Sequence, residues 1–205
     1  MRRRDLIVPV VAAMLAAGCA STIPPAGGDV RRARGRVLLL RGLANIFSTG
    51  MDGLAQRVAA HGFVAEVRNH TAWGSLAAEV VAEARADTLP RPFAVVGHSL
   101  GADDAIRLVG AAGARGVATD LLVTFDPVFL GTAPRGPLLV LNFHQASGGW
   151  GRPLDPAPGF DGRIENIALD GDDGLNHFNI EKVPRLHRRV IDALDGLAAG
   201  RGWRG

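Results

Sequence analysis

The stretch PFAVVGHSLGADDAIRLVG, residues 92–110, decides the fold of this chain. It joins the apolar run FAVV (93–96), a Gly-x-Ser-x-Gly pentapeptide at 97–101, and apolar residues at helical spacing from about residue 100 to 112. A short apolar run that ends in a glycine-containing turn is typical of a buried strand leading into a helix. The pentapeptide, with Ser99 at its centre, is therefore predicted to lie at a strand-to-helix junction.

The same alternation extends along the rest of the chain. Short apolar runs predict further strands, and apolar residues at helical spacing predict the helices between them. Strands and helices in alternation favour a three-layer α/β domain, with a mostly parallel central sheet and helices on both faces. Besides residues 93–96, the predicted strands lie at 37–40, 63–67, 121–125, 138–143 and 164–169. The predicted helices lie near 51–61, 74–86, 100–112 and 181–198.

Composition and charge are those of one globular domain, and we expect a monomer. The 205 residues are 47% hydrophobic, which is enough for one sizeable core. The formal net charge is +3, but Arg2–Arg4 and Asp5 lie in a segment that we expect to be removed, which leaves a net charge of +1. So small a charge gives no electrostatic basis for binding nucleic acid.

The N-terminus has the layout of a secretory signal. Three arginines precede an apolar stretch from Leu6 to Ala17, which is too short to span a bilayer comfortably. The single cysteine, Cys19, follows small residues, and this arrangement resembles the lipobox of bacterial lipoproteins, in which the cysteine is lipidated. Residues 1–18 would then be a signal peptide, and the mature protein would be anchored in the cell envelope, at the periplasmic face or the cell surface. The alternatives are an ordinary signal peptide cut after Ala20 and an uncleaved anchor.

Two further segments have the composition of irregular structure. Residues 19–36 mix Pro, Gly, Ser and Arg without periodicity, which predicts a flexible tether before a folded domain at 37–205. The long insert HQASGGWGRPLDPAPGFDG, at 144–162, has the glycine, proline and aromatic content of a loop that covers a site.

The strand-to-helix context makes Ser99 a candidate nucleophile. A sharp turn would hold Ser99 at strained backbone angles, and Gly97 and Gly101 would remove the Cβ atoms that otherwise collide with neighbouring backbone. The hydroxyl would project above the sheet edge, where the Leu100 amide at the start of the helix could stabilise an oxyanion. The alternative is that Ser99 is only a small residue in a tight turn.

In these features the chain resembles the α/β-hydrolase superfamily, from Val37 to the C-terminal helix. The segments RGLANIFSTGMDGLAQRV (41–58) and LNHFNIEK (175–182) look like those of small bacterial members. The resemblance implies an α/β-hydrolase fold. The predicted strand at 138–143 follows so soon after Asp126 that a helical lid has no room between them, so we expect the minimal form without a cap domain. The resemblance also implies a catalytic triad in the chain order serine, acid, histidine, and no need for a cofactor.

A nucleophilic serine needs a base, and the chain contains six histidines. The chain order of the superfamily leaves His144, His177 and His187. His187 lies among arginines on the last predicted helix, a solvated position where positive charge opposes protonation, and His144 closes the strand at 138–143. His177 lies in the loop between the last strand and the last helix, the usual place for the base in the superfamily, and is the preferred candidate.

The acid of the triad should directly follow a strand, because it must reach the imidazole from the carboxyl edge of the sheet. The strand at 121–125 leads into Asp126, and Pro127 favours an extended backbone there. Asp126 is therefore the preferred acid. Asp173 or one of its neighbours, and Asp155, are the alternatives.

The superfamily takes its second oxyanion amide from the loop after its first central strand. Here that loop opens Arg41-Gly42-Leu43, so Leu43 joins Leu100 as a candidate donor, with Ala44 as the alternative. Aromatic residues of the loops could wall an acyl pocket or could belong to the core. The candidates for substrate contact are Phe47, Phe129 and Trp150.

The resemblance thus implies an enzyme that hydrolyses a small carboxylic ester or thioester through an acyl-Ser99 intermediate. His177 would act as base, Asp126 would hold it, and no metal ion is expected. Two alternatives remain open: an acyltransferase that uses the same triad, and a non-catalytic binding lipoprotein of the envelope built on the same fold.

Overall fold

A computed structural model of the chain describes residues 20–43, 48–172 and 174–200. Its centre is a seven-stranded sheet in the order β1-β3-β2-β4-β5-β7-β9. All neighbouring strands are parallel except β1, which is antiparallel to β3. The strands are β1 (Ser21–Ile23), β2 (Arg36–Arg41), β3 (Val64–Asn69), β4 (Phe93–His98), β5 (Thr119–Phe125), β7 (Pro137–His144) and β9 (Arg163–Ala168).

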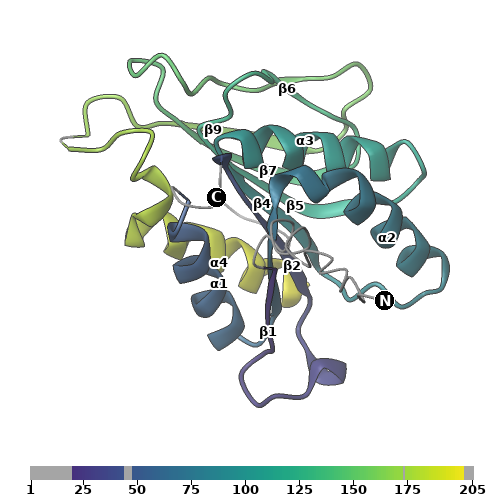
Figure 1. Cartoon of the computed structure of the whole chain (residues 1–205). Coiled ribbons are helices and arrows are strands. Elements are labelled where there is room, and N and C mark those ends of the chain that lie inside the picture. Colours follow the sequence, from purple (N-terminus) through teal and green to yellow (C-terminus); the bar gives the residue numbers. More distant parts are fainter. Residues whose placement is uncertain (1–19, 44–47, 173, 201–205) are drawn as a thin grey trace, which may run out of the picture.

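Helices cover both faces of this sheet (Figure 1). Two of them, α1 and α4, pack on one face, and α2 and α3 pack on the other, so the domain has three layers. The helices are α1 (Gly50–Ala60), α2 (Trp73–Arg85), α3 (Leu100–Gly113) and α4 (Pro184–Ala198), with short 3-10 turns η1 (Val30–Arg32), η3 (His70–Ala72) and η4 (Ile180–Lys182).

The central strands are buried on both faces. Because successive side chains of a strand point to opposite faces, alternate residues of β2 and β4 enter two separate cores. Val37, Leu39 and Val96 face α1 and α4, whereas Leu38 and Val95 face α2 and α3. A strand covered on both sides needs apolar residues at every position, which is why continuous runs and not alternating ones marked these strands in the sequence.

The mostly parallel α/β architecture predicted from the sequence is present, and every predicted strand and helix is found. The insert at 144–162 contains one element that was not predicted. Its short strand β8 (Asp155–Pro156) pairs in parallel with β6 (Thr132–Ala133) in a separate two-stranded sheet. Strands of two residues show no periodicity that a sequence pattern could reveal.

The segment expected to be a tether also differs from the prediction. Ser21–Ile23 pairs with Ala65–Val67 at the edge of the sheet. Thr22 and Ile23 are β-branched, and the outer edge of β3 offers backbone N–H and C=O groups for pairing, so three residues suffice to extend the sheet. Within 19–36, these residues therefore belong to the folded domain.

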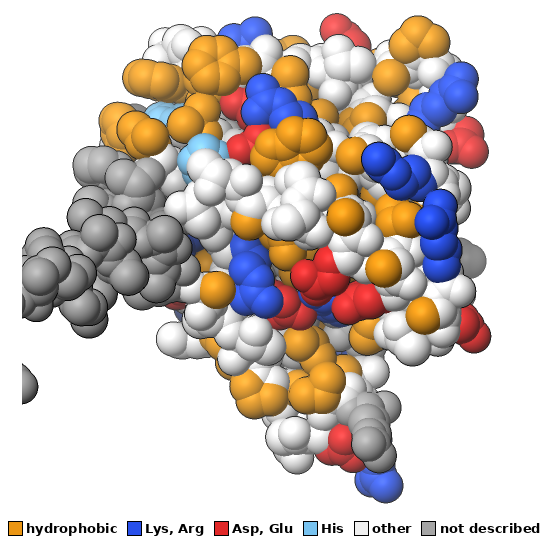
Figure 2. Space-filling view, turned by 45° about the vertical axis from the view of Figure 1, so that its right-hand side comes forward, with side chains coloured by type: hydrophobic (Ala, Val, Ile, Leu, Met, Phe, Trp, Pro, Cys, Tyr) orange, Lys and Arg blue, Asp and Glu red, His pale blue; other side chains and the backbone are white. Residues whose placement is uncertain are grey.

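The surface carries charges of both signs. Figure 2 shows acidic and basic side chains side by side across one face, with hydrophobic side chains gathered toward its upper left. This mixture fits the small formal net charge of +3. Within the part of the chain that is described, the helices are too short or too polar to cross a bilayer.

Candidate active site

The Gly-x-Ser-x-Gly pentapeptide forms a sharp turn between β4 and α3. Ser99 has φ 59° and ψ −126°, a combination that residues other than glycine rarely adopt. A Cβ atom on Gly97 would lie 2.1 Å from the carbonyl oxygen of Gly101. A Cβ atom on Gly101 would lie 2.3 Å from the carbonyl oxygen of Leu40. Both glycines are therefore required, because the turn packs backbone against backbone.

Three side chains meet at the carboxyl end of the sheet, from the loops after β4, β5 and β9. His177 Nε2 lies 2.9 Å from Ser99 Oγ, and His177 Nδ1 lies 3.2 Å from Asp126 Oδ2. Because an ionised carboxylate only accepts hydrogen bonds, Nδ1 carries the proton and Nε2 presents its lone pair to the serine hydroxyl. The structure thus brings the three preferred candidates together in the order hydroxyl, imidazole and carboxylate.

Asp126 is fully buried, and backbone groups hold both its carboxylate and its main chain. Its Oδ1 accepts the N–H of Gln145 at 2.8 Å, and its own N–H donates to the carbonyl of Phe143 at 2.9 Å. A Cβ atom on Gly151 would lie 2.1 Å from Asp126 Oδ1. The loop after β7 can therefore approach the carboxylate only because residue 151 is glycine.

Backbone strain is concentrated at this site. Of three described non-glycine residues with positive φ, two are Ser99 and Asp126, the latter with φ 48°. The extended backbone that Pro127 was expected to impose on Asp126 is therefore absent. The hydrogen bonds at Asp126 hold this conformation against the local preference. Strained residues of this kind persist where their surroundings enforce them, and they cluster at functional sites.

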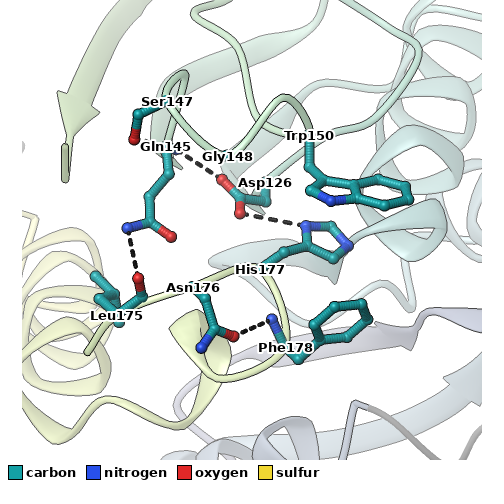
Figure 3. Close-up of a pocket in the computed structure, with 9 residues that line it drawn as sticks. All are labelled: Asp126, Gln145, Ser147, Gly148, Trp150, Leu175, Asn176, His177 and Phe178. Atoms are coloured by element: carbon teal, nitrogen blue, oxygen red, sulfur yellow. Dashed lines mark hydrogen bonds and ion pairs between the residues drawn. The ribbon is translucent and has the colours of Figure 1, made fainter.

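Aromatic rings enclose His177, as Figure 3 shows. The Trp150 ring stacks on the imidazole with centroids 4.9 Å apart, and the Phe178 ring meets it edge-on at 5.3 Å. As a result, His177 is only 7% exposed. Trp150 belongs to the insert at 144–162, so this insert does lie over the cluster, as its composition predicted.

A cavity of about 370 Å³ opens beside Ser99. Its volume is near the lower end of the roughly 300–1,000 Å³ common for ligand pockets. Among the described residues that line it there is no Asp, Glu, Lys or Arg, and several large apolar side chains at its mouth are about half exposed. The apolar lining comprises Leu43, Leu100, Val128, Phe129, Trp150 and Phe178.

A second cavity, of about 220 Å³, lies on the Asp126 side of the imidazole. Trp150, His177 and Phe178 line both cavities and so stand between them. The second cavity is the more polar, since Gln145 and Asn176 also line it, and Figure 3 shows its lining residues.

The remaining preferred candidates are found at the first cavity where the structure describes them. Leu100 is the first residue of α3, so its N–H has no carbonyl partner within the helix. Leu43 is 60% exposed, and Phe129 and Trp150 both line the cavity. Phe47, Ala44, Asp173 and the predicted lipidation site Cys19 lie outside the described residues. Phe178 was not selected from the sequence, although it directly follows His177.

The described alternative residues lie away from Ser99. His144 ends β7, and Asp155 lies in β8. His187 was expected on a solvated face but is only 3% exposed, and its Nε2 donates to the carbonyl of Glu181 at 2.7 Å. Burial lowers the pKa of both His144 and His187 below the usual value. His187 is buried because it lies on the inward face of α4.

Asp103, which the sequence analysis did not select, fixes one wall of the cavity. Its fully buried carboxylate accepts the backbone N–H groups of Phe129 at 3.1 Å and Leu130 at 2.9 Å. Burial raises the pKa of this carboxyl, and the backbone donors oppose that shift. An acidic residue on the buried face of the first turn of α3 is the signal that could have indicated this role.

No protein-family model and no curated protein matches the chain. Solved structures do match its fold. Apo esterase 2 of Thermogutta terrifontis superposes with a TM-score of 0.58 at 11% identity, covering 91% of each chain. The same esterase with propionate or butyrate bound gives TM-scores of 0.56 and 0.54, both at 12% identity and 91% coverage of each chain.

Two further solved structures are similar over most of their length. A protein of unknown function from Agrobacterium tumefaciens, described as a candidate α/β hydrolase, gives a TM-score of 0.52 at 17% identity, covering 88% of this chain and 91% of its own. Esterase PE8 gives 0.53 at 16% identity, covering 87% of this chain and 98% of its own. At these identities the likeness concerns the fold, and the chain has an α/β-hydrolase-like fold.

Proposed function

We propose that this chain is a serine hydrolase that cleaves a carboxylic ester or thioester through an acyl-Ser99 intermediate. The observation that carries the proposal is the hydrogen-bonded chain from Asp126 through His177 to Ser99 at the mouth of an apolar cavity. The strained backbone at Ser99 and Asp126 supports it, because the surrounding structure maintains a geometry that the isolated residues disfavour.

In the acylation step, Ser99 Oγ attacks the carbonyl carbon while His177 Nε2 takes the hydroxyl proton. The carbonyl oxygen becomes an oxyanion, and the Leu100 and Leu43 amides are the proposed donors to it. Asp126 keeps the imidazole in the tautomer with the proton on Nδ1. When the tetrahedral intermediate collapses, the bond to the leaving alcohol or thiol breaks, and that group takes the proton from Nε2.

In the deacylation step, a water molecule replaces the leaving group. His177 Nε2 removes a proton from the water as its oxygen attacks the acyl carbon. The second tetrahedral intermediate then releases Ser99 Oγ, which takes the proton back from Nε2. The products are a carboxylic acid and the free enzyme, so the cycle needs no other reactant.

The cavity supports a small, uncharged substrate. A volume of about 370 Å³ has room for a short acyl chain, and burying an unpaired charge among apolar side chains would be costly. The similar esterase from Thermogutta terrifontis has been solved with propionate and with butyrate bound. We therefore propose short acyl groups as the preferred substrates.

The decisive experiment is substitution of the proposed nucleophile. Ser99→Ala should lower the turnover of p-nitrophenyl butyrate at least about 10³-fold and abolish labelling by a fluorophosphonate. The exposed Ser75→Ala, on α2, is the matched control and should behave as the parent. Turnover of Ser99→Ala within a few-fold of the parent would contradict the proposal. If added alcohols divert most of the acyl group from water, the chain is an acyltransferase with the same triad.

We also propose, from the sequence alone, that Cys19 is lipidated and anchors the protein in the cell envelope. Metabolic labelling with palmitate tests this directly. The parent should incorporate label and partition into detergent, and Cys19→Ser should not. Unlabelled, exported protein that begins at Ser21 would show a conventional signal peptide instead.

A further inference from the structure

We propose that His98 positions both the base His177 and the loop that carries the Leu43 amide. The inference rests on the proposed function, because it assigns a role within the same site. His98 is the last residue of β4 and directly precedes Ser99. Because side chains alternate along a strand, His98 is on the same face of β4 as Ala94 and Val96, the face that α1 and α4 cover.

Both ring nitrogens of His98 have partners in different loops. Nδ1 lies 2.8 Å from Ser48 Oγ, in the loop that leads into α1. Nε2 lies 2.8 Å from the backbone oxygen of His177, in the loop after β9. The two imidazole rings are 5.1 Å apart, and His98 is 1% exposed, so water does not compete for either nitrogen.

The donor and the acceptor of each hydrogen bond in this network can be assigned. The His177 carbonyl only accepts, so His98 Nε2 carries the proton and Nδ1 is the acceptor. Ser48 Oγ–H must then donate to Nδ1, which leaves the Ser48 oxygen free to accept the Gly42 N–H at 2.9 Å. A continuous path therefore runs from the backbone at Gly42, through Ser48 and His98, to the backbone of His177.

This path joins parts of the site that the sheet alone leaves far apart. β9 is three strands from β4, which is about 14 Å at the usual spacing between strands. The loop after β9 must reach back over this distance to bring His177 to Ser99. The hydrogen bond from His98, the residue before the nucleophile Ser99, holds this loop at His177 itself.

The charge state of His98 suits a fixed contact. Burial lowers the pKa of His98 to about 4, so one neutral tautomer is present at neutral pH. The carboxylate of Glu181 lies 3.8 Å from Nε2, too far for a hydrogen bond, and burial raises the pKa of that carboxyl. The network therefore keeps the same pattern of donors across the range in which a hydrolase would work.

Substitutions can separate the hydrogen bonds from the packing. His98→Leu fills similar space without either hydrogen bond. His98→Gln can place an amide N–H near the position of Nε2 and so retain the bond to His177. Ser48→Ala breaks only the arm that leads to Gly42. Each rate should be divided by the concentration of active sites, measured by titration with a fluorophosphonate. Unfolded protein then does not contribute to kcat.

We expect His98→Leu to lower kcat for p-nitrophenyl butyrate about 100-fold with KM within about threefold, because sub-ångström displacement of a base reduces turnover more than binding. His98→Gln should recover about tenfold of that loss, and Ser48→Ala should lower kcat about tenfold. His187→Leu is the matched control. His187 is equally buried and also donates from Nε2 to a backbone carbonyl, yet it lies outside the site, so its kcat per titrated site should equal the parent value.

Three results would overturn the inference. The first is a kcat of His98→Leu within threefold of the parent per titrated site. The second is a His98→Gln value as low as that of His98→Leu, which would mean that packing alone matters. If His98→Leu does not fold, an unchanged kcat in both His98→Gln and Ser48→Ala overturns it equally. A parent that neither turns over esters nor reacts with the probe would instead refute the proposed function, and this inference with it.

Discussion

Gly151 acts in the candidate site by having no side chain. It lies in the loop that carries Trp150, and a Cβ atom there would reach within 2.1 Å of Asp126 Oδ1. The carboxylate that orients His177 is therefore enclosed by the same loop that stacks Trp150 on the imidazole. The positions of the acid and of the aromatic cover are coupled through one residue.

Replacing this glycine should disturb the acid without removing it. We expect Gly151→Ala to lower kcat about 100-fold, because the new methyl group displaces either the Asp126 carboxylate or the loop. Esterase kinetics at saturating substrate would measure this. The control is Gly53→Ala on α1, where a Cβ atom meets nothing within 4 Å. That variant should keep its activity and gain about 0.5–1 kcal/mol in free energy of unfolding. Equal activity of the two variants would contradict the coupling.

At the residue scale the sequence selected three side chains that the structure brings together, but it did not predict all of their conformations. The pentapeptide selected Ser99, the chain order and the usual loop position of the base in the superfamily selected His177, and a carboxylate directly after a strand selected Asp126. The positive φ of Asp126 and the stacking of Trp150 were not predictable. Both depend on how the loop after β7 folds back over the sheet, and no local pattern records that path.

Arg36 illustrates how elements are joined in this fold. The sequence placed it in a tether, as one of several arginines, but the structure buries it at the start of β2, 4% exposed. Its Nε lies 2.8 Å from a Glu66 oxygen on β3, and its other nitrogens bind Glu79 at 2.6 Å and Glu83, both on α2. Burial lowers the pKa of Arg36, but the carboxylates outweigh it and the net shift is upward. Three elements thus share one cation.

Removing that cation should leave Glu66, the buried carboxylate of the cluster, with its ion pair to Arg68 but without the one to Arg36. We expect Arg36→Met to lower the free energy of unfolding by about 3–5 kcal/mol, because Glu66 stays nearly buried beside an apolar side chain. Urea unfolding followed by circular dichroism would measure the change. Arg107→Met removes an ion pair to Asp104 whose arginine is 44% exposed, and it should cost no more than about 1 kcal/mol. A loss as small as this for Arg36→Met would show that the cluster is not structural.

The three-layer arrangement follows from the sequence because long, periodic elements produce it. The short strands β1, β6 and β8 were missed, since two or three residues carry no period. They form because the surrounding fold offers them a partner: β1 extends the edge of β3, and β6 pairs with β8. Such pairings are decided by tertiary contacts that only the folded chain contains.

The whole molecule should lose stability in mild acid. Burial lowers the pKa of His98, His144 and His187, so below about pH 6.5 the unfolded chain binds protons that the folded chain does not. The contribution of these neutral histidines to the free energy of unfolding should therefore be fully present above about pH 6.5 and should decrease as the pH falls toward 4. Urea titrations at pH 7 and pH 5 would show this as a lower midpoint at pH 5, and His187→Leu should reduce the difference.

Glu181 acts in the opposite direction. Burial raises the pKa of this carboxyl, so the folded chain holds a proton that the unfolded chain has released once the pH exceeds about 4.5. Its contribution to stability declines as the pH rises through that range. Glu181→Gln should remove this decline and make the acid sensitivity of the histidines steeper. A midpoint that does not change between pH 5 and pH 7 in Glu181→Gln would contradict the assignment of both effects.

Strand β1 sets how far the domain could stand from a membrane. It begins at Ser21, only two residues after Cys19, and Ser21 pairs with Val67 near the carboxyl end of β3. Two residues of extended chain span at most about 7 Å. A lipid on Cys19 would thus hold this corner of the sheet near the lipid headgroups, at the same carboxyl edge that carries Ser99. Such an enzyme would sample esters within a thin layer at the bilayer surface, and its effective substrate concentration would be set by partitioning into that layer.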